Sequence, residues 1–168
     1  GVKMLWLMPI YPISTTKKKG SLGSYYAVSD YTAVNPEFGT PEDFKNLVDK
    51  IHALDMKVIL DWVPNHTGWD HVWIEKNPEY FTHVADTITH PFMDGELTDW
   101  YDVAELNFDN MEMREEMTKA LEYWITEYDV DGYRCDVAFE VPDDFWDTAV
   151  PRMRALKPVF MLAEAEHA

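Results

Sequence analysis

The sequence has a single cysteine, Cys135, among its 168 residues. One cysteine cannot form a disulfide within the chain, which excludes a small disulfide-stapled scaffold. Positive charge is also scarce, since 14 Lys and Arg face 31 Asp and Glu for a formal net charge of −17. A surface of this sign repels nucleic acid and anionic membranes, and it suits a neutral substrate better than a phosphorylated one. No stretch approaches the roughly 20 apolar residues that span a bilayer.

The motifs of several enzyme classes are missing as well. Neither a G-x-G-x-x-G nor a G-x-x-x-x-G-K loop occurs, and the serines lack the setting of a nucleophile elbow. The six histidines show no His-Glu-x-x-His spacing, so we expect no catalytic zinc site. Aromatic residues, at 14%, are in contrast abundant. Most of them are expected in the core, but aromatic faces also serve as platforms for sugars.

The chain alternates short apolar runs with segments of helical spacing. The runs predict four buried strands, at residues 4–10, 57–63, 131–137 and 158–163. The helical spacing predicts three helices, at residues 41–54, 112–128 and 143–156. Strands separated by helices imply right-handed crossovers and a parallel sheet, which fits either half of a (β/α)8 barrel or a doubly wound sheet.

Two segments fall outside this alternation. Residues 67–105 lack a clear period and predict a short inserted subdomain, which is more often functional than not at this length. The three lysines from Lys17 to Lys19 predict an exposed, mobile loop over residues 14–20.

Each predicted strand after the first ends in a chemically active group. Asp61 and His66 end the second strand or follow it, Arg134 and Asp136 end the third, and Glu164 ends the fourth. In a barrel such ends converge on one rim, where active sites lie. This pattern favours the barrel over the doubly wound sheet.

Arg134 and Asp136 are two residues apart on a strand, so they point to the same side. A neighbouring guanidinium is expected to lower the pKa of Asp136 and keep it ionised, as a glycosyl nucleophile must be. Taken alone, the pattern fits a structural ion pair equally well.

Glu164 follows an uninterrupted apolar run. A carboxyl at the rim of such a strand is expected to be partly desolvated, which favours the protonated form that a general acid needs. Glu166 lies further into the following loop and is the weaker candidate for this role. Adjacent strands lie about 4.7–4.9 Å apart, which suits the separation of about 5–5.5 Å between the two carboxyls of a retaining glycosidase.

These motifs together resemble the α-amylase family of glycoside hydrolases. Three ordered segments are similar to its conserved regions, and they are Asp61-Trp62-Val63-Pro64-Asn65-His66, Asp131-Gly132-Tyr133-Arg134-Cys135-Asp136-Val137-Ala138 and Met161-Leu162-Ala163-Glu164. The resemblance extends over essentially all 168 residues. It implies a partial (β/α)8 barrel over residues 1–168, about strands 2 to 5, with the short insertion at 67–105 after strand 3.

The resemblance implies a role for each site residue. Asp136 would be the nucleophile, Glu164 the acid and then the base, and Arg134 the group that orients Asp136. His66 would bind sugar hydroxyls, and Tyr26 would stack on the same sugar ring. No cofactor is expected for the chemistry, although Asn65 matches a position that ligates a structural calcium ion in many members. The third catalytic carboxylate of the family is expected outside this chain.

The function implied is a retaining hydrolase of the α-1,4-glucosidic bonds of starch or malto-oligosaccharides. A transferase or isomerase of the same family, or a non-catalytic glucan-binding relative, stays open as an alternative. Phe139-Glu140 stands where the family often has Lys-His, which leaves product specificity open. The 168-residue segment alone is expected to be inactive. Export is favoured over the cytoplasm, because starch-degrading members are commonly exported.

Overall fold

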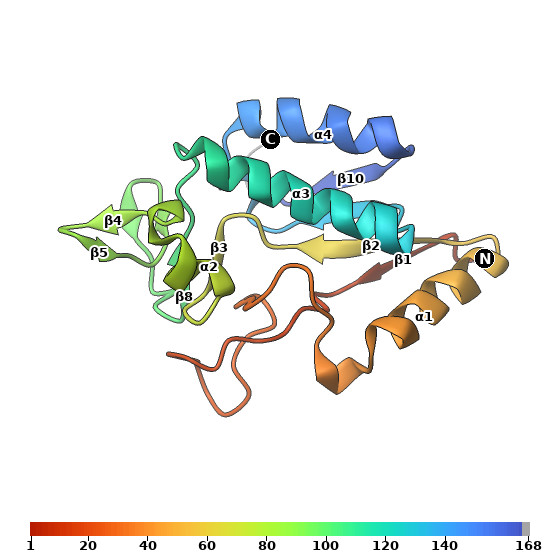
Figure 1. Ribbon diagram of the computed structural model, residues 1–168, viewed down its shortest axis with the longest axis horizontal. Coiled ribbons are helices and arrows are strands. Elements are labelled where there is room, and N and C mark those ends of the chain that lie inside the picture. Colours follow the sequence, from red (N-terminus) through yellow and green to blue (C-terminus); the bar gives the residue numbers. More distant parts are fainter. Residues whose placement is uncertain (166–168) are drawn as a thin grey trace.

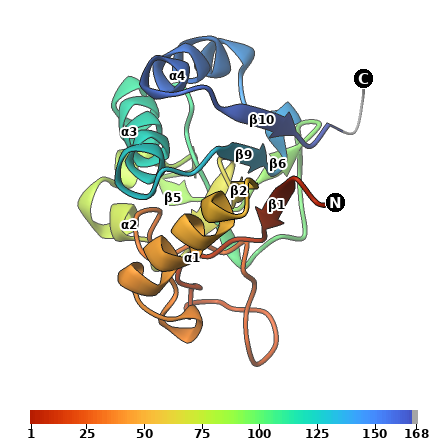
Figure 2. The same ribbon diagram turned by 90° about the vertical axis from the view of Figure 1, so that its right-hand side faces the viewer.

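The computed structural model describes residues 1–165 and contains a four-stranded parallel sheet. Its order is β1-β2-β9-β10, which are Met4–Leu7, Lys57–Trp62, Gly132–Cys135 and Phe160–Ala163. The helices that connect them are α1 (Pro41–Ala53), α3 (Met111–Tyr128) and α4 (Asp143–Leu156). All three lie on one side of the sheet (Figures 1 and 2). The predicted parallel β-α-β arrangement is therefore confirmed.

The segment between β2 and α3 forms a group of small elements at one end of the sheet (Figure 1). Strand β3 (His66–Gly68) pairs antiparallel with β8 (Val103–Glu105) and closes the segment at its base. Between them lie α2 (Val72–Lys76), the 3-10 turn η2 (Pro78–Tyr80) and two hairpins, β4 (His83–Val84) with β5 (Thr87–Ile88) and β6 (Phe92–Met93) with β7 (Glu96–Leu97). Two further 3-10 turns are η1 (Pro36–Phe38) and η3 (Ala138–Glu140).

Local signals fix the ends of α1 as the sequence predicts. The Thr40 hydroxyl accepts from the Asp43 N–H at 3.1 Å, and the Asp43 carboxylate accepts from the Thr40 N–H at 2.8 Å. This reciprocal capping box satisfies free donors at the start of the helix. Beyond the helix end, Asp55 adopts the left-handed conformation with φ of 55°.

The hydrophobic core lies between the sheet and its helices. Leu60, Trp62 and Tyr133 are fully buried on this side, and Trp124 of α3 packs against them through the aromatic ring of Tyr11. Because side chains alternate along a strand, the other side of the sheet carries a different set. There Trp6, Phe160 and Leu162, on the two edge strands, are about half exposed.

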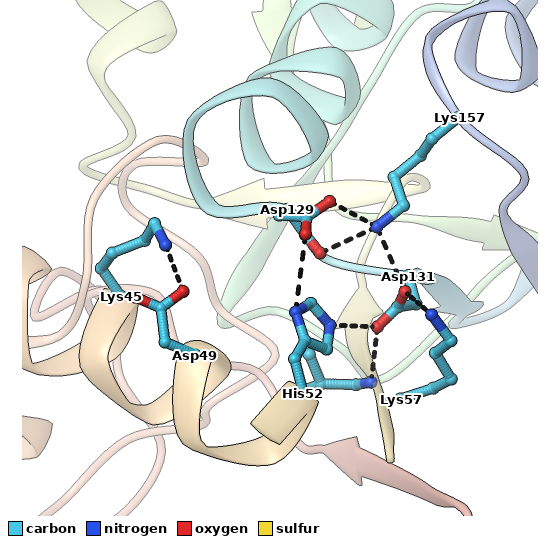
Figure 3. A network of polar contacts seen from close by, with 8 residues as sticks. Lys45, Asp49, His52, Lys57, Asp129, Asp131 and Lys157 are labelled. Carbon is cyan, nitrogen blue, oxygen red and sulfur yellow. Dashed lines mark hydrogen bonds and ion pairs between the residues drawn. The ribbon is translucent and has the colours of Figure 1, made fainter. Parts of the chain in front are cut away.

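A network of charged residues joins the βα units at the opposite end of the sheet from the insertion (Figure 3). Asp131 accepts from the N–H of Val58 at 3.0 Å, from His52 at 2.8 Å, and from Lys57 and Lys157 at 3.1 Å each. Burial by itself raises the pKa of Asp131, but these hydrogen bonds outweigh it and lower the pKa to about 2. The network therefore stabilises the sheet above acidic pH.

No helix within residues 1–165 is both long enough and apolar enough to cross a membrane.

Candidate active site

Arg134 binds three carboxylates at the ends of three neighbouring strands. Its Nη1 lies 3.0 Å from Asp61 Oδ1 and 2.8 Å from Asp136 Oδ1, and its Nη2 lies 2.9 Å from Glu164 Oε1. Asp136 and Glu164 therefore sit on the same side of the sheet, as ligands of one planar guanidinium. The sequence predicts this meeting of the two carboxyls, and the structure confirms it.

The protonation of Asp136 differs from the sequence prediction. Burial raises the pKa of Asp136 to about 7, with the charges of Glu164 and Asp61 adding to the rise. Arg134 acts in the expected direction and lowers it, but by less. The prediction of a lowered pKa is wrong because one guanidinium is shared among three carboxylates in a buried place.

The two carboxyls are buried to different degrees. The Asp136 side chain is 12% exposed, whereas that of Glu164 is 40% exposed. The reason is that β10 is an edge strand of the described sheet, so neighbours cover Glu164 from one side only. The Glu164 Oε2 atom accepts a hydrogen bond from the backbone N–H of Val137 at 2.8 Å, which adds a second fixed contact to the one with Arg134.

Val137, directly after Asp136, has a left-handed backbone with φ of 48° and ψ of 38°. A β-branched residue rarely adopts this conformation, which costs about 1–3 kcal/mol and is typical of active sites. The turn at Val137 ends β9 and aims its N–H at Glu164. The strain at this position is thus coupled to the placement of the second carboxyl.

Asp61 supports the site from below. Its side chain is fully buried and accepts hydrogen bonds from Trp6 Nε1 at 3.2 Å, from the Tyr26 hydroxyl at 3.3 Å and from Arg134. Burial raises the pKa of Asp61, although these donors oppose the rise. Asp61 therefore orients Arg134 and Tyr26 and lies apart from the cavity itself.

A cavity of about 400 Å³ opens above these groups. Four predicted site residues line it, namely Tyr26, His66, Asp136 and Glu164, while Arg134 lies beneath them. Burial lowers the pKa of His66 to about 4, so its ring is neutral at physiological pH. Burial and the nearby Asp61 raise the pKa of Tyr26 to about 12, so its hydroxyl keeps its proton. Both can donate hydrogen bonds to a neutral ligand.

Eight further residues line the cavity, and none of them is among the predicted site residues. They are Lys19, Ser24, Met93, Trp100, Asp102, Val103, Val137 and Phe139. The prediction of a mobile loop over 14–20 is wrong in part, because Ser14 is buried and Lys19 pairs with Asp102 of the insertion at 3.1 Å. Three lysines in an otherwise acidic chain were the available signal, but only the fold shows which of them faces the cavity.

No group of three or more His, Cys, Asp or Glu side chains within residues 1–165 could hold a metal ion. Asn65 is buried beside His66, with its Nδ2 atom 3.4 Å from His66 Nδ1. These side chains alone do not make the calcium site that the resemblance implies at Asn65. Glu166, the weaker candidate for the acid, lies outside the described residues.

The comparison with known proteins identifies the family. The family sequence model for the alpha amylase catalytic domain matches residues 1–105 and 98–156. The chain belongs to the α-amylase family. An α-amylase structure from Lactobacillus plantarum superposes with a TM-score of 0.91 at 45% identity, over 98% of this chain and 38% of that one. A maltogenic α-amylase structure from Thermotoga neapolitana gives a TM-score of 0.91 at 38% identity, over 99% of this chain and 38% of that one.

Sequence relatives agree with the structural ones. Alpha-amylase 3 of Dictyoglomus thermophilum is 33% identical over 97% of this chain and 36% of that protein. An intracellular maltogenic amylase of Bacillus subtilis is 32% identical over 99% of this chain and 29% of that protein. The chain thus spans about a third of the length of its α-amylase relatives, and the fold seen here is part of the α-amylase catalytic domain.

Proposed function

We propose that the full-length protein is a retaining hydrolase of the α-1,4-glucosidic bonds of starch or malto-oligosaccharides. The observation that carries this proposal is the single guanidinium of Arg134, which binds Asp136 and Glu164 together at the floor of the cavity. Retaining glycosidases require two carboxyls that lie close together and flank the scissile bond. We also propose that β1, β2, β9 and β10 are strands 2 to 5 of a (β/α)8 barrel.

In the first step, Asp136 attacks the anomeric carbon. Arg134 holds Oδ1, so we assign the attack to Oδ2. As the C–O bond to the leaving sugar breaks, Glu164 donates a proton to the glycosidic oxygen. A covalent glycosyl-enzyme intermediate results, and charge balance is kept because the carboxylate negative charge moves from Asp136 to Glu164.

In the second step, Glu164 takes a proton from a water molecule that attacks the same carbon and releases Asp136. The contacts of Glu164 with Arg134 and with the Val137 N–H hold its carboxylate in place for this step. His66 and Tyr26 donate hydrogen bonds to hydroxyls of the bound sugar, and the Tyr26 ring supports one face of it.

The charges around the cavity favour a neutral substrate. Carboxylates of Asp61, Asp102, Asp136 and Glu164 outnumber the cations Arg134 and Lys19, which already pair with them. A phosphorylated sugar would face repulsion. One relative, from Arcanobacterium haemolyticum, is named a maltose-1-phosphate maltosyltransferase, and it is 32% identical over 98% of this chain. A transferase therefore remains the second candidate, and the charge pattern argues against its phosphorylated donor.

The test uses the full-length protein, soluble starch and maltose. Wild type is expected to release reducing sugar from starch, and Asp136→Asn and Glu164→Gln are each expected to lose at least about 10³-fold in kcat. Asp86→Asn, on the exposed β4–β5 hairpin, is the matched control and should keep wild-type activity. Full activity of Asp136→Asn would refute the assignment. Products longer than the substrate would favour a transferase, and trehalose from maltose an isomerase.

Two smaller proposals accompany the function. We propose that the chemistry needs no cofactor, so kcat should survive dialysis against a chelator, while a lower melting temperature after dialysis would indicate a structural calcium ion. We also propose that the protein is exported, since starch-degrading members of the family are commonly exported. Activity confined to washed cell lysates would contradict that proposal.

A further inference from the structure

The loop over residues 14–23 is fastened to the insertion at its base. The Asp70 carboxylate accepts from the Thr15 N–H at 2.8 Å, from the Thr15 hydroxyl at 2.9 Å and from the Thr16 N–H at 3.2 Å. Gly68 packs so closely on this loop that a Cβ added there would lie 2.1 Å from Ser14 Cβ. The path of the loop toward the cavity is therefore fixed by contacts on the insertion.

Further along this loop, Lys19 reaches back to the insertion at the cavity wall. Its ammonium lies 3.1 Å from Asp102 Oδ1, donates to the Asp99 carbonyl at 2.9 Å and sits 4.5 Å from the centre of the Tyr101 ring. The Asp102 side chain is only 8% exposed, whereas that of Lys19 is 38% exposed. A nearly buried carboxylate is costly without a partner, so Lys19 and Asp102 form one unit.

Trp100 joins this unit to the reaction centre. Its ring lies 5.8 Å from that of His66 in an edge-to-face arrangement, and both rings line the cavity together with Lys19 and Asp102. The cavity wall beside His66 therefore carries three groups side by side, which are the ammonium of Lys19, the carboxylate of Asp102 and the indole of Trp100. None of these three takes part in the bond-breaking steps described above.

We propose that Lys19, Asp102 and Trp100 form a second sugar-binding position next to the one bounded by Tyr26 and His66, and that this position determines which glucan chain length is preferred. The inference rests on the proposed function and deepens it. Neighbouring hydroxyls of a glucose unit can accept from the remaining N–H of Lys19 and donate to the Asp102 carboxylate, and charge-assisted hydrogen bonds of this kind are strong. The indole offers an apolar surface for the sugar face.

The pairing of the two charges explains why a neutral sugar fits better than an anion. Lys19 is neutralised by Asp102, and Asp136 and Glu164 line the same cavity. Because the loop and the insertion hold both groups in place before a ligand arrives, little side-chain freedom is lost on binding. The position is thus built for hydroxyl groups and for a defined register along the chain.

The experiment compares Lys19→Met with Lys18→Met in the full-length protein. Lys18 lies in the same loop but is exposed and donates to the Ser21 carbonyl at 2.7 Å, outside the set that lines the cavity. Both are assayed for kcat and KM on maltose through maltoheptaose. Lys19→Met is expected to raise KM about tenfold or more for the longer oligosaccharides and by less than about threefold for the shortest one cleaved, with kcat nearly unchanged. Lys18→Met should match wild type at every length.

Further variants separate sugar binding from a structural role. Asp102→Asn should give the same length dependence, and the double variant should be no worse than the more affected single one, since the two residues act as a unit. Lys19→Arg should restore much of the affinity for long chains. If Lys19→Met does not fold, as its melting curve would show, Trp100→Leu carries the same length test.

Four results would overturn the inference. The first two concern Lys19→Met, which would have the same KM as Lys18→Met at all oligosaccharide lengths, or would raise KM equally at all lengths. The third is a Trp100→Leu variant whose change in KM does not depend on oligosaccharide length, and the fourth is a wild-type preference for maltose 1-phosphate that Lys19→Met abolishes. The last would make Lys19 a phosphate ligand. If wild type cleaves no α-glucan at all, the proposed function itself fails, which is a different outcome from the four above.

Discussion

Removing the guanidinium of Arg134 should move the acid limb of the pH–rate profile toward higher pH. An opposite charge at the 2.8 Å seen between Arg134 and Asp136 lowers the pKa of a carboxyl by about 1–3 units. Even with this help, the pKa of Asp136 is about 7 because of burial and the neighbouring carboxylates. In Arg134→Gln it should therefore rise by about 1–3 units, and the ionised share of Asp136 at pH 7 should fall by about 5- to 500-fold.

The assay is kcat/KM on a malto-oligosaccharide from pH 5 to pH 10, with full-length Arg134→Gln and wild type. We expect a loss of at least about fivefold at pH 7 and a partial recovery at higher pH, as Asp136 ionises. Arg134→Lys keeps the charge but cannot bind three carboxylates at once, so its shift should be smaller. A buried ion pair that loses one partner also costs about 3–5 kcal/mol of stability, so melting curves accompany every variant.

Arg152→Gln is the matched control for this experiment. Arg152 also binds two carboxylates, those of Glu115 and Glu122, but it does so between α3 and α4, away from the cavity. Its removal should leave the pH profile unchanged. An acid limb that stays in place in folded Arg134→Gln would refute the reasoning, because Arg134 would then have no part in ionising the nucleophile.

Four further variants test the fold, one of them as a control. Asp131→Asn should lower the free energy of unfolding by about 2 kcal/mol at pH 7, because the pKa of Asp131 is lowered to about 2. This contribution is present above about pH 4 and is lost as the pH falls through 2. Denaturant unfolding of the variant and wild type should therefore differ at pH 7 and not at pH 2. Gly132→Ala should lower the free energy of unfolding by about 3 kcal/mol or more, measured by thermal unfolding, since the added Cβ would lie 1.8 Å from the Phe160 carbonyl oxygen. Gly95→Ala is the control, because a Cβ added there meets open space, and it should lower the free energy of unfolding by about 1 kcal/mol. Thr40→Ala should cost about 1 kcal/mol through the lost cap. Equal losses for both glycine variants, or an Asp131→Asn effect that persists at pH 2, would contradict these expectations.

The parts of the fold that depend on local chemistry were predictable from the sequence. Thr40 and Pro41 predict the start of α1, and in the structure the helix begins at Pro41 with Thr40 as its N-cap. The helix predicted over 143–156 has those bounds, and the strands are one to three residues shorter than the apolar runs that predict them. The meeting of Asp136 and Glu164 followed from the rule that parallel strands end at one edge.

The rest depends on tertiary context that no local pattern carries. The number of carboxylates that share Arg134 decides the pKa of Asp136, and no local pattern gives that number. The left-handed turn at Val137 runs against the preference of a β-branched residue, so the sequence predicts its opposite. Lys19 was indistinguishable from Lys17 and Lys18 until the fold placed it beside Asp102.

The most direct test of the central claim is to trap the glycosyl-enzyme. The full-length protein is incubated with a fluorinated maltosyl fluoride that forms the intermediate faster than it hydrolyses, and the digested protein is mapped by mass spectrometry. The account predicts one added maltosyl unit on the peptide that contains Asp136, attached to that side chain. A label on Glu164, or active enzyme that carries no label and releases the inverted anomer, would contradict it.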